Sequence, residues 1–245
     1  MIKDFYSGLR CLFVGFSLIR QRGLRRFVVL PLAINVLVFG ALLWLGGEWF
    51  AGVLDEYLPE MLDIAILRYA IWIIFGGAAL LIAFYTFVLV ANFIAAPFNG
   101  VLAERVEQTL TGNRPPSSGR VLAVVGTVAE ELLAELQKLL YLLVWMLPFA
   151  ALMVIPGLAI IIGPLWFLLS CWLLALEYID YPASNHEIRF KELRQRLRER
   201  RALALGFGAA VVIGTMIPVL NLFVMPAAVA GGTALWVNEL SRKRS

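Results

Sequence analysis

The sequence contains few of the residues that carry metal and redox chemistry. It has one histidine, His186, and two cysteines, Cys11 and Cys171, which lie far apart in apolar surroundings. A disulfide framework or a thiolate metal site needs more cysteines, or closer ones, and one histidine excludes a histidine-cluster metal centre. No glycine-rich phosphate loop, Ser/His/Asp arrangement or convincing pair of catalytic carboxylates is present. We therefore expect no cofactor, no bound metal and no enzymatic activity.

Charge is also scarce. Charged residues make up 16% of the 245 residues and hydrophobic residues 61%, whereas soluble domains average about 25% charged and 45–50% apolar. The mean hydropathy of +0.85 points the same way, so we predict one all-α integral membrane domain over residues 1–245, in contact with membrane lipids. The net charge of +4 comes from loops rather than from a uniform basic surface, which argues against nucleic acid as a partner.

Two long apolar runs predict membrane-spanning helices. Residues 27–46 have about the 20 residues that a roughly 30 Å hydrocarbon core requires, and residues 64–96 are interrupted only by Arg68 and Asn92. Residues 1–22 carry apolar side chains at helical spacing and predict an amphipathic N-terminal helix. Residues 97–138 predict further amphipathic helices, and residues 185–201 predict a basic helix. By the positive-inside rule, the N-terminus, both of these segments and the C-terminus are cytoplasmic.

Two more apolar blocks, 139–178 and 202–237, are broken by proline and glycine. The first divides at Pro156-Gly157, and the second divides between Pro218 and Pro226 into arms of about 14 and 11 residues, too short to cross the membrane core. Each block begins and ends on the cytoplasmic side, so we predict two helical hairpins that penetrate the membrane partly. For the first block, a hairpin that crosses fully also remains open.

Such paired, interrupted segments are a pointer to a transport site, because broken helices expose backbone dipoles within the bilayer. Asn35 and Asn99 place amides within or beside the apolar runs, and Glu104, Arg105 and Glu107 follow one turn after a predicted helix start at Asn99. Glu104 and Glu107 share a helix face. Two interpretations stay open for the charged group: a solvated face with internal ion pairs, or a network that lines an internal ion path.

The segment Gly23-Leu24-Arg25-Arg26 is the best candidate for an anion site. Gly23 permits close backbone approach or a positive φ, and the helix start that follows supplies free N–H groups and a positive dipole end. Arg25 and Arg26 add planar, permanently charged donors that suit tetrahedral oxyanions. The alternative is that the arginines of residues 20–26 only anchor a membrane helix on its cytoplasmic side.

Three stretches resemble the CysZ family of bacterial inner-membrane sulfate permeases: "RGLRRFVVLPLAINVLVFG" (22–40), "ANFIAAPFNGVLAERVE" (91–107) and "LEYIDYPASNHEIRF" (176–190). The resemblance implies a multi-pass protein of the bacterial inner membrane that takes up sulfate for assimilation into cysteine. It also implies two spanning helices, two partly penetrating hairpins and assembly as a homo-oligomer. Its sulfate site corresponds to Gly23, Leu24, Arg25 and Arg26.

No ATP-binding motif is present, so the resemblance leaves a channel-like or a gradient-driven route open. A broader oxyanion channel that carries sulfite or thiosulfate, and a non-transporting scaffold that regulates a partner, are the alternatives. Sidedness raises a further question: a site beside the basic N-terminus faces the cytoplasm. It would then act at the exit or in regulation, unless some subunits insert in the opposite orientation.

Overall fold

The computed structural model describes residues 1–57, 73–74, 76–78, 80–81, 98–116, 128–155 and 157–241. Within these ranges every regular element is a helix, so the predicted all-α class is confirmed. Contacts divide the chain into two compact units: unit 1 comprises Met1–Val28 and Asn99–Ser245, and unit 2 comprises Val29–Phe98. Most of what the structure describes belongs to unit 1.

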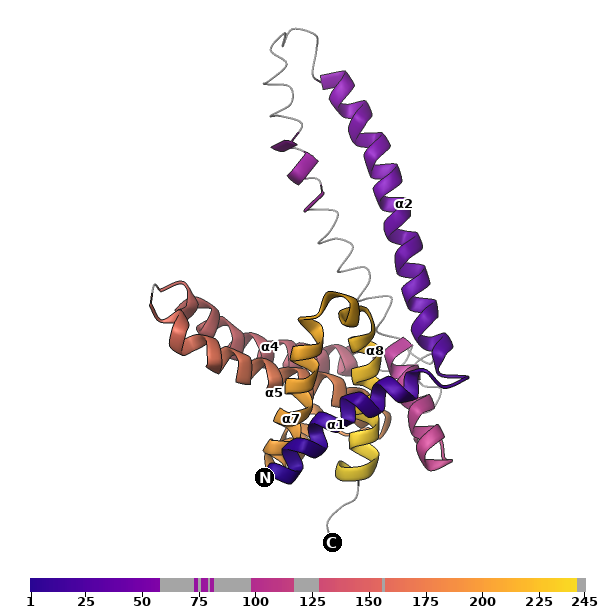
Figure 1. Cartoon of the computed structure of the whole chain (residues 1–245), viewed down its shortest axis with the longest axis vertical. Helices are drawn as coiled ribbons and strands as arrows, with labels where there is room; N and C mark the ends of the chain where they lie inside the picture. The colour runs from indigo at the N-terminus through magenta and orange to yellow at the C-terminus, as the bar shows by residue number, and fades with distance from the viewer. Residues whose placement is uncertain are drawn as a thin grey trace. The chain divides into compact units, whose positions relative to one another are not determined.

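The centre of unit 1 is the crossing of α1 (Ile2–Ile19) with α7 (Arg201–Thr215) and α8 (Pro218–Leu235), which Figure 1 shows. Glycines bring these backbones together. A Cβ on Gly8 would overlap the carbonyl oxygen of Leu203, and one on Gly15 would overlap that of Ala227. Small residues allow such close helix packing in membranes, where dispersion contacts rather than the hydrophobic effect hold helices together.

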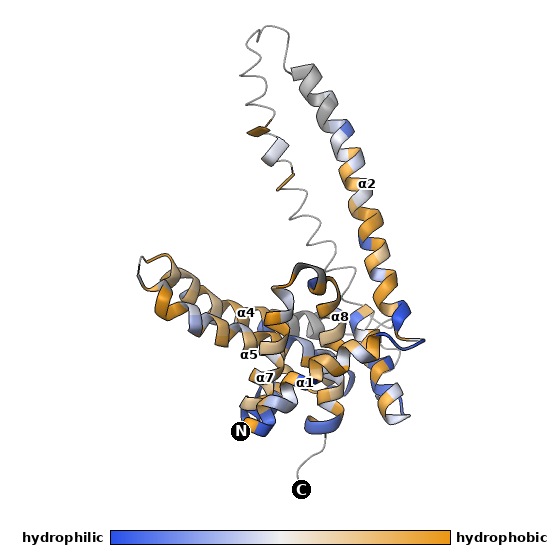
Figure 2. Cartoon of the chain, in the orientation of Figure 1, coloured by the Kyte–Doolittle hydropathy of each residue, from blue (hydrophilic) through white to orange (hydrophobic). Residues whose placement is uncertain are grey.

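A long hairpin extends from this core. It consists of α4 (Val128–Met153) and α5 (Ala159–Asn185), which lie side by side (Figure 1). The turn between them includes Gly157 with φ +87°, a backbone conformation that favours glycine. Its described residues are mostly hydrophobic towards the turn (Figure 2), and no residue of Leu136–Met153 is buried. The hairpin therefore exposes an apolar surface suited to lipid.

Polar contacts fix the ends of α1 and of the short basic helix α6 (Phe190–Glu199). Arg200 follows α6, and its guanidinium contacts Asp4 Oδ1 at 3.1 Å and Glu239 Oε2 at 3.0 Å. Glu239 lies in the π-helical η2 (Trp236–Leu240). Burial lowers the pKa of Arg200, but the hydrogen bonds and charges of Asp4 and Glu239 outweigh burial, so the pKa is raised. Arg200 is therefore a charged link between three segments.

In unit 2 the described structure is mainly α2 (Arg25–Tyr57), which begins in unit 1. It starts two residues before the predicted span 27–46 and extends eleven residues past it. The helix continues through Gly46, Gly47 and the acidic residues that follow. The second predicted span, 64–96, lies outside the described residues except for 73–74, 76–78 and 80–81, which are helical.

Four helices in the described part of the chain are long and apolar enough to cross a membrane: 25–49, 136–153, 160–185 and 220–240. The fourth differs from the sequence interpretation, which divided this block between Pro218 and Pro226. Pro218 lies in the first turn of α8, where a proline loses no intrahelical hydrogen bond. Pro226 lies inside the helix. Pro182 likewise lies inside α5, which extends past residue 178 to Asn185.

The segment predicted as amphipathic over 97–138 is described in two pieces. A helix covers residues 98–111, with Leu102, Ala103 and Val106 fully buried. It ends at Gly112, whose φ of +76° suits glycine. The second piece is the beginning of α4 at Val128, and residues 117–127 between them lie outside the description. The helix 98–111 forms one wall of the candidate site.

Candidate functional site

The loop between α1 and α2 is a tight turn built around Gly23. Gly23 has φ +104°, a conformation that other residues rarely adopt. Leu24, 4% exposed, belongs to the hydrophobic core and anchors the loop. The carbonyl oxygen of Gln21 accepts hydrogen bonds from the N–H groups of Leu24 and Arg25, each at 3.2 Å. The sequence thus folds here into a fixed reversal that leads directly into α2.

A pocket of about 320 Å³ opens at this loop, and all its lining residues belong to unit 1. The loop and the first turn of α2 form one wall, and the helix 98–111 forms the other. The lining residues are Gln21, Arg22, Gly23, Leu24, Arg26, Arg105, Gln108 and Thr109. Every charged residue among them is an arginine. The pocket is therefore a cationic cavity built from two segments about 80 residues apart.

Backbone donors are also available at the loop. Among the described residues, the N–H groups of Gly23 and Arg26 have no backbone acceptor, whereas those of Leu24 and Arg25 are bound to Gln21. The N–H groups of Gly23 and Arg26 lie at the start of α2, where the helix dipole favours an anion. Of the four predicted binding residues, Gly23, Leu24 and Arg26 line the pocket. Arg25 is exposed and is not among its lining residues.

The two arginines of the first wall are held differently. Arg26 lies over the ring of Phe27, with 4.9 Å between the guanidinium carbon and the ring centroid. This contact stabilises the side chain without neutralising it. Arg22 is exposed, and the predicted anion site, residues 23–26, did not include it. Within the described ranges neither residue makes an ion pair, so both charges remain available to an anion.

The residues of unit 1 that were predicted to line an internal path do not line one common pocket. Arg105 lines the pocket at the loop, while Asn99 and Glu107 face α5. Glu104 is half-buried and does not line the pocket. Asn35 lies on α2 in unit 2, and its Oδ1 is shielded from solvent with no partner among the described residues. The path through Asn35, Asn99, Glu104 and Glu107 stays a prediction.

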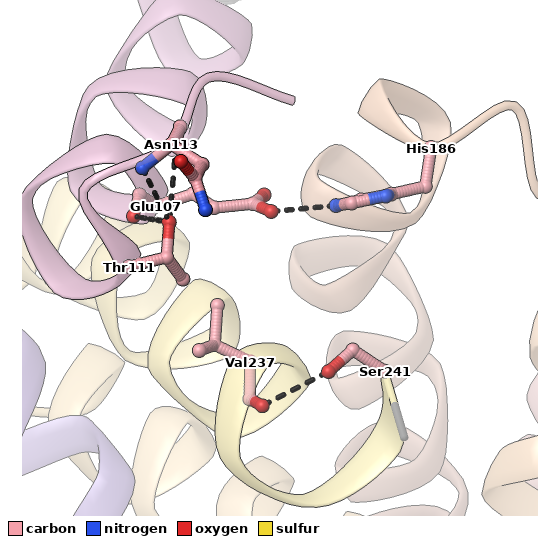
Figure 3. Close-up of polar contacts among 6 residues, drawn as sticks. All are labelled: Glu107, Thr111, Asn113, His186, Val237 and Ser241. Atoms are coloured by element: carbon pink, nitrogen blue, oxygen red, sulfur yellow. Dashed lines mark hydrogen bonds and ion pairs between the residues drawn. The ribbon is translucent and has the colours of Figure 1, made fainter. Parts of the chain in front are cut away.

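The contacts to α5 give the helix 98–111 a fixed rotation. Glu107 and His186 point toward one another (Figure 3), with 2.6 Å between Glu107 Oε1 and His186 Nε2. Asn99 Nδ2 donates to the hydroxyl of Tyr181 at 3.3 Å. The His186 ring also packs on Trp236, with 5.7 Å between the ring centroids. Glu107 is thereby directed at α5, and the opposite side of the helix is free to face the loop.

Sequence reasoning missed Gln21, Gln108, Thr109 and the role of Arg22. A signal for part of this wall was present: Arg105, Gln108 and Thr109 stand at positions i, i+3 and i+4 and share a helix face. What the sequence does not contain is the partner of that face, because the pairing joins segments that are distant in the chain.

One family model matches residues 11–226, most of the chain, and it describes the sulfate transporter CysZ/etoposide-induced protein 2.4 family. The chain belongs to this family. The match covers α1 from Cys11, the loop at Gly23, the helix 98–111 and the hairpin, and it ends within α8. Together with the four long apolar helices, it makes this chain an all-α membrane protein of a transporter family. Both walls of the cationic pocket lie within the matched range.

Proposed function

We propose that this protein transports sulfate across the bacterial inner membrane into the cytoplasm, where the sulfate feeds cysteine biosynthesis. The family supports sulfate transport in general. The proposal for this chain rests on one observation: the pocket at the Gly23 loop has only arginines as charged residues, and its lining includes Gly23 and Arg26, whose N–H groups have no backbone acceptor among the described residues. Such a site fits a small tetrahedral oxyanion.

The chemistry of sulfate explains why the pocket needs both kinds of donor. A dianion loses a strong hydration shell on binding, and that loss must be offset by charge and by several hydrogen bonds. Arg26 offers planar guanidinium donors, while Gly23 and Arg26 offer N–H groups at a helix start. The volume of about 320 Å³ is well above the roughly 30 Å³ that one water molecule occupies in the liquid, so the pocket has room for a small oxyanion.

The basic segments around the pocket favour the cytoplasmic side. In uptake the pocket then acts where sulfate leaves the membrane or as a regulatory site, unless some subunits insert in the opposite orientation. The chain carries no ATP-binding motif, so the route is channel-like or driven by a gradient. The apolar surface of the α4–α5 hairpin fits contact with lipid and with further copies of the chain in a homo-oligomer.

The test is flux of radiolabelled sulfate into proteoliposomes that contain the purified full chain. We expect uptake well above that of empty vesicles and a loss of at least tenfold in the double variant Arg25→Ala/Arg26→Ala. Lysine at both positions keeps the charge and loses the planar fork, so we expect an intermediate flux. Because Arg26 lines the pocket and Arg25 does not, Arg26→Ala alone should reduce the flux more than Arg25→Ala. Arg198→Ala, on the exposed part of α6, is the control.

Two results would contradict the proposal. If the parent protein neither binds nor moves sulfate, the chain is a scaffold or regulator rather than a transporter. If sulfite and thiosulfate pass as fast as sulfate and compete equally with it, the protein is a broader oxyanion channel.

A further inference from the structure

Arg105 lines the pocket as a cation with no anionic partner among the described residues. Its Nη1 donates to Gln108 Oε1 at 3.2 Å, a neutral acceptor. Its Nε is shielded from solvent and has no hydrogen-bond partner among the described residues. An unpaired buried donor costs about 1–3 kcal/mol, more when the group is charged. The two nearby carboxylates do not compensate: Glu107 pairs with His186, and neither Glu104 nor Glu107 forms an ion pair with Arg105 among the described residues.

The pocket therefore gathers like charges. Arg22, Arg26 and Arg105 surround one cavity with no carboxylate in its lining, and none of them forms an ion pair within the ranges that the structure describes. Like charges around a common cavity repel one another, and a bound anion removes that repulsion. Two arginines on one wall and one on the other match a doubly charged anion better than a singly charged one.

The other residues of the second wall differ in what they can donate. The hydroxyl of Thr109 donates its only hydrogen to the carbonyl oxygen of Arg105 at 2.7 Å, so it has none for an anion. The Gln108 carbonyl oxygen is occupied by Arg105, while no described residue accepts from its two amide N–H groups. Arg105 thus orients Gln108 with its acceptor satisfied and its donors available.

We infer that Arg105 and Gln108 bind the oxyanion directly, as the second half of a clamp whose first half is the Gly23 loop. The inference rests on the proposed function, since the anion is the transported sulfate. The helix 98–111 then supplies the charge that makes the site selective for dianions. Its attachment to α5 through Glu107 and His186 fixes where Arg105 stands.

The experiment measures anion affinity of the detergent-purified full chain by calorimetry, with sulfate, selenate and perchlorate as probes. Perchlorate is tetrahedral like sulfate but carries one charge, so the pair separates charge from shape. We expect Arg105→Gln to weaken sulfate and selenate binding about 10- to 100-fold and perchlorate binding much less. Arg105→Lys should restore sulfate affinity in part. Arg198→Gln removes one positive charge from an exposed site outside the pocket and should leave all three affinities unchanged.

Gln108→Glu is the second variant, and it does not depend on the folding of the Arg105 variants. It keeps the side-chain size and places a carboxylate beside Arg105, so we expect sulfate binding to be lost. If the parent binds no sulfate, the proposed function itself fails. If the parent binds sulfate and both Arg105→Gln and Gln108→Glu bind it like Arg198→Gln, only the clamp is wrong. An equal loss of sulfate and perchlorate affinity in Arg105→Gln would also overturn the dianion selectivity.

Discussion

Two helices of unit 1 have nearly the same mean hydropathy and opposite surroundings. It is 1.7 for residues 136–153 of α4 and 1.6 for residues 220–240, which form α8 and η2. None of the first window is buried, whereas 61% of the second is. Hydropathy alone therefore does not tell which apolar helix faces lipid and which one faces protein.

Side-chain size accounts for the difference. The exposed residues of α4 are mostly large, such as Leu140, Leu143, Trp145 and Leu147. The buried part of α8 is a run of small residues at 227–234, and a Cβ on Gly231 would overlap the carbonyl oxygen of Cys11 on α1. Close backbone approach gives dispersion contacts along the whole crossing, which lipid chains cannot match. Small residues thus select protein as the neighbour of α8, and large ones leave α4 to lipid.

The largest expected effect comes from adding one methyl group at the crossing. Gly15→Ala places a Cβ against the backbone of Ala227 and 2.8 Å from the N atom of Gly231, where no side chain can move aside. We expect a loss of about 3 kcal/mol, the upper part of the usual range for overpacking, seen as a lower thermal unfolding midpoint in detergent.

The matched control is the same change in the hairpin. At Gly163 on α5 a Cβ meets no atom within 4 Å, so Gly163→Ala should be neutral or stabilise the helix by up to about 1 kcal/mol. Equal midpoints for the two variants would show that the α1–α8 crossing is looser than its geometry requires.

Proline shows what could and could not be predicted about the fold from sequence. The break at Pro156-Gly157 was predictable, because Gly157 supplies the positive φ of the turn. Pro31, Pro148, Pro164 and Pro226, by contrast, lie inside helices. A proline removes one backbone hydrogen bond, and a packed or membrane helix tolerates that loss when neighbouring groups compensate. The second hairpin was therefore divided too late in the sequence.

The candidate site was predictable on one wall only. The order glycine, leucine, arginine, arginine before a helix start indicates an anion site through local chemistry, and Gly23 does take a positive φ. The opposite wall depends on tertiary packing: Arg105 faces the loop because Glu107 and Asn99 face α5. No local pattern distinguishes such a helix rotation from a solvated face. For the same reason the predicted site did not include Arg22.

A smaller effect on stability is expected when the same substitution, valine to alanine, is made in each of the two helices. Val224 of α8 is fully buried, whereas Val144 of α4 is 66% exposed. Val224→Ala removes buried methyl groups and leaves a cavity, so we expect a loss of about 2 kcal/mol. Val144→Ala should change stability by less than about 0.5 kcal/mol in detergent. If Val144→Ala destabilises the purified protein as much, α4 is covered by protein, most simply by a second copy of the chain.

The smallest effect concerns the α1 side of the crossing. Burial, with a further contribution from the carboxylate of Glu239, raises the pKa of the Cys11 thiol from 9.0 to about 11. The contribution of this raised pKa to stability is complete below pH 9 and is lost as the pH rises toward 11, because only the unfolded thiol ionises in that interval. By pH 10 the stability lost in this way amounts to about 1 kcal/mol. It is measured as the change with pH in the stability difference between the parent and Cys11→Ala.

Alkylation tests the raised pKa of the Cys11 thiol in the folded protein, without unfolding it. Two pKa units correspond to a roughly 100-fold smaller thiolate fraction at neutral pH. In a Cys171→Ala background, Cys11 should therefore react far more slowly with iodoacetamide than a reference thiol at an exposed site, such as Lys191→Cys on α6. The difference should vanish in denaturant, where both thiols meet water. If Cys11 reacts as fast as the exposed thiol in the folded protein, the α1 crossing opens readily. The close packing that distinguishes α8 from α4 would then be present in only part of the protein molecules.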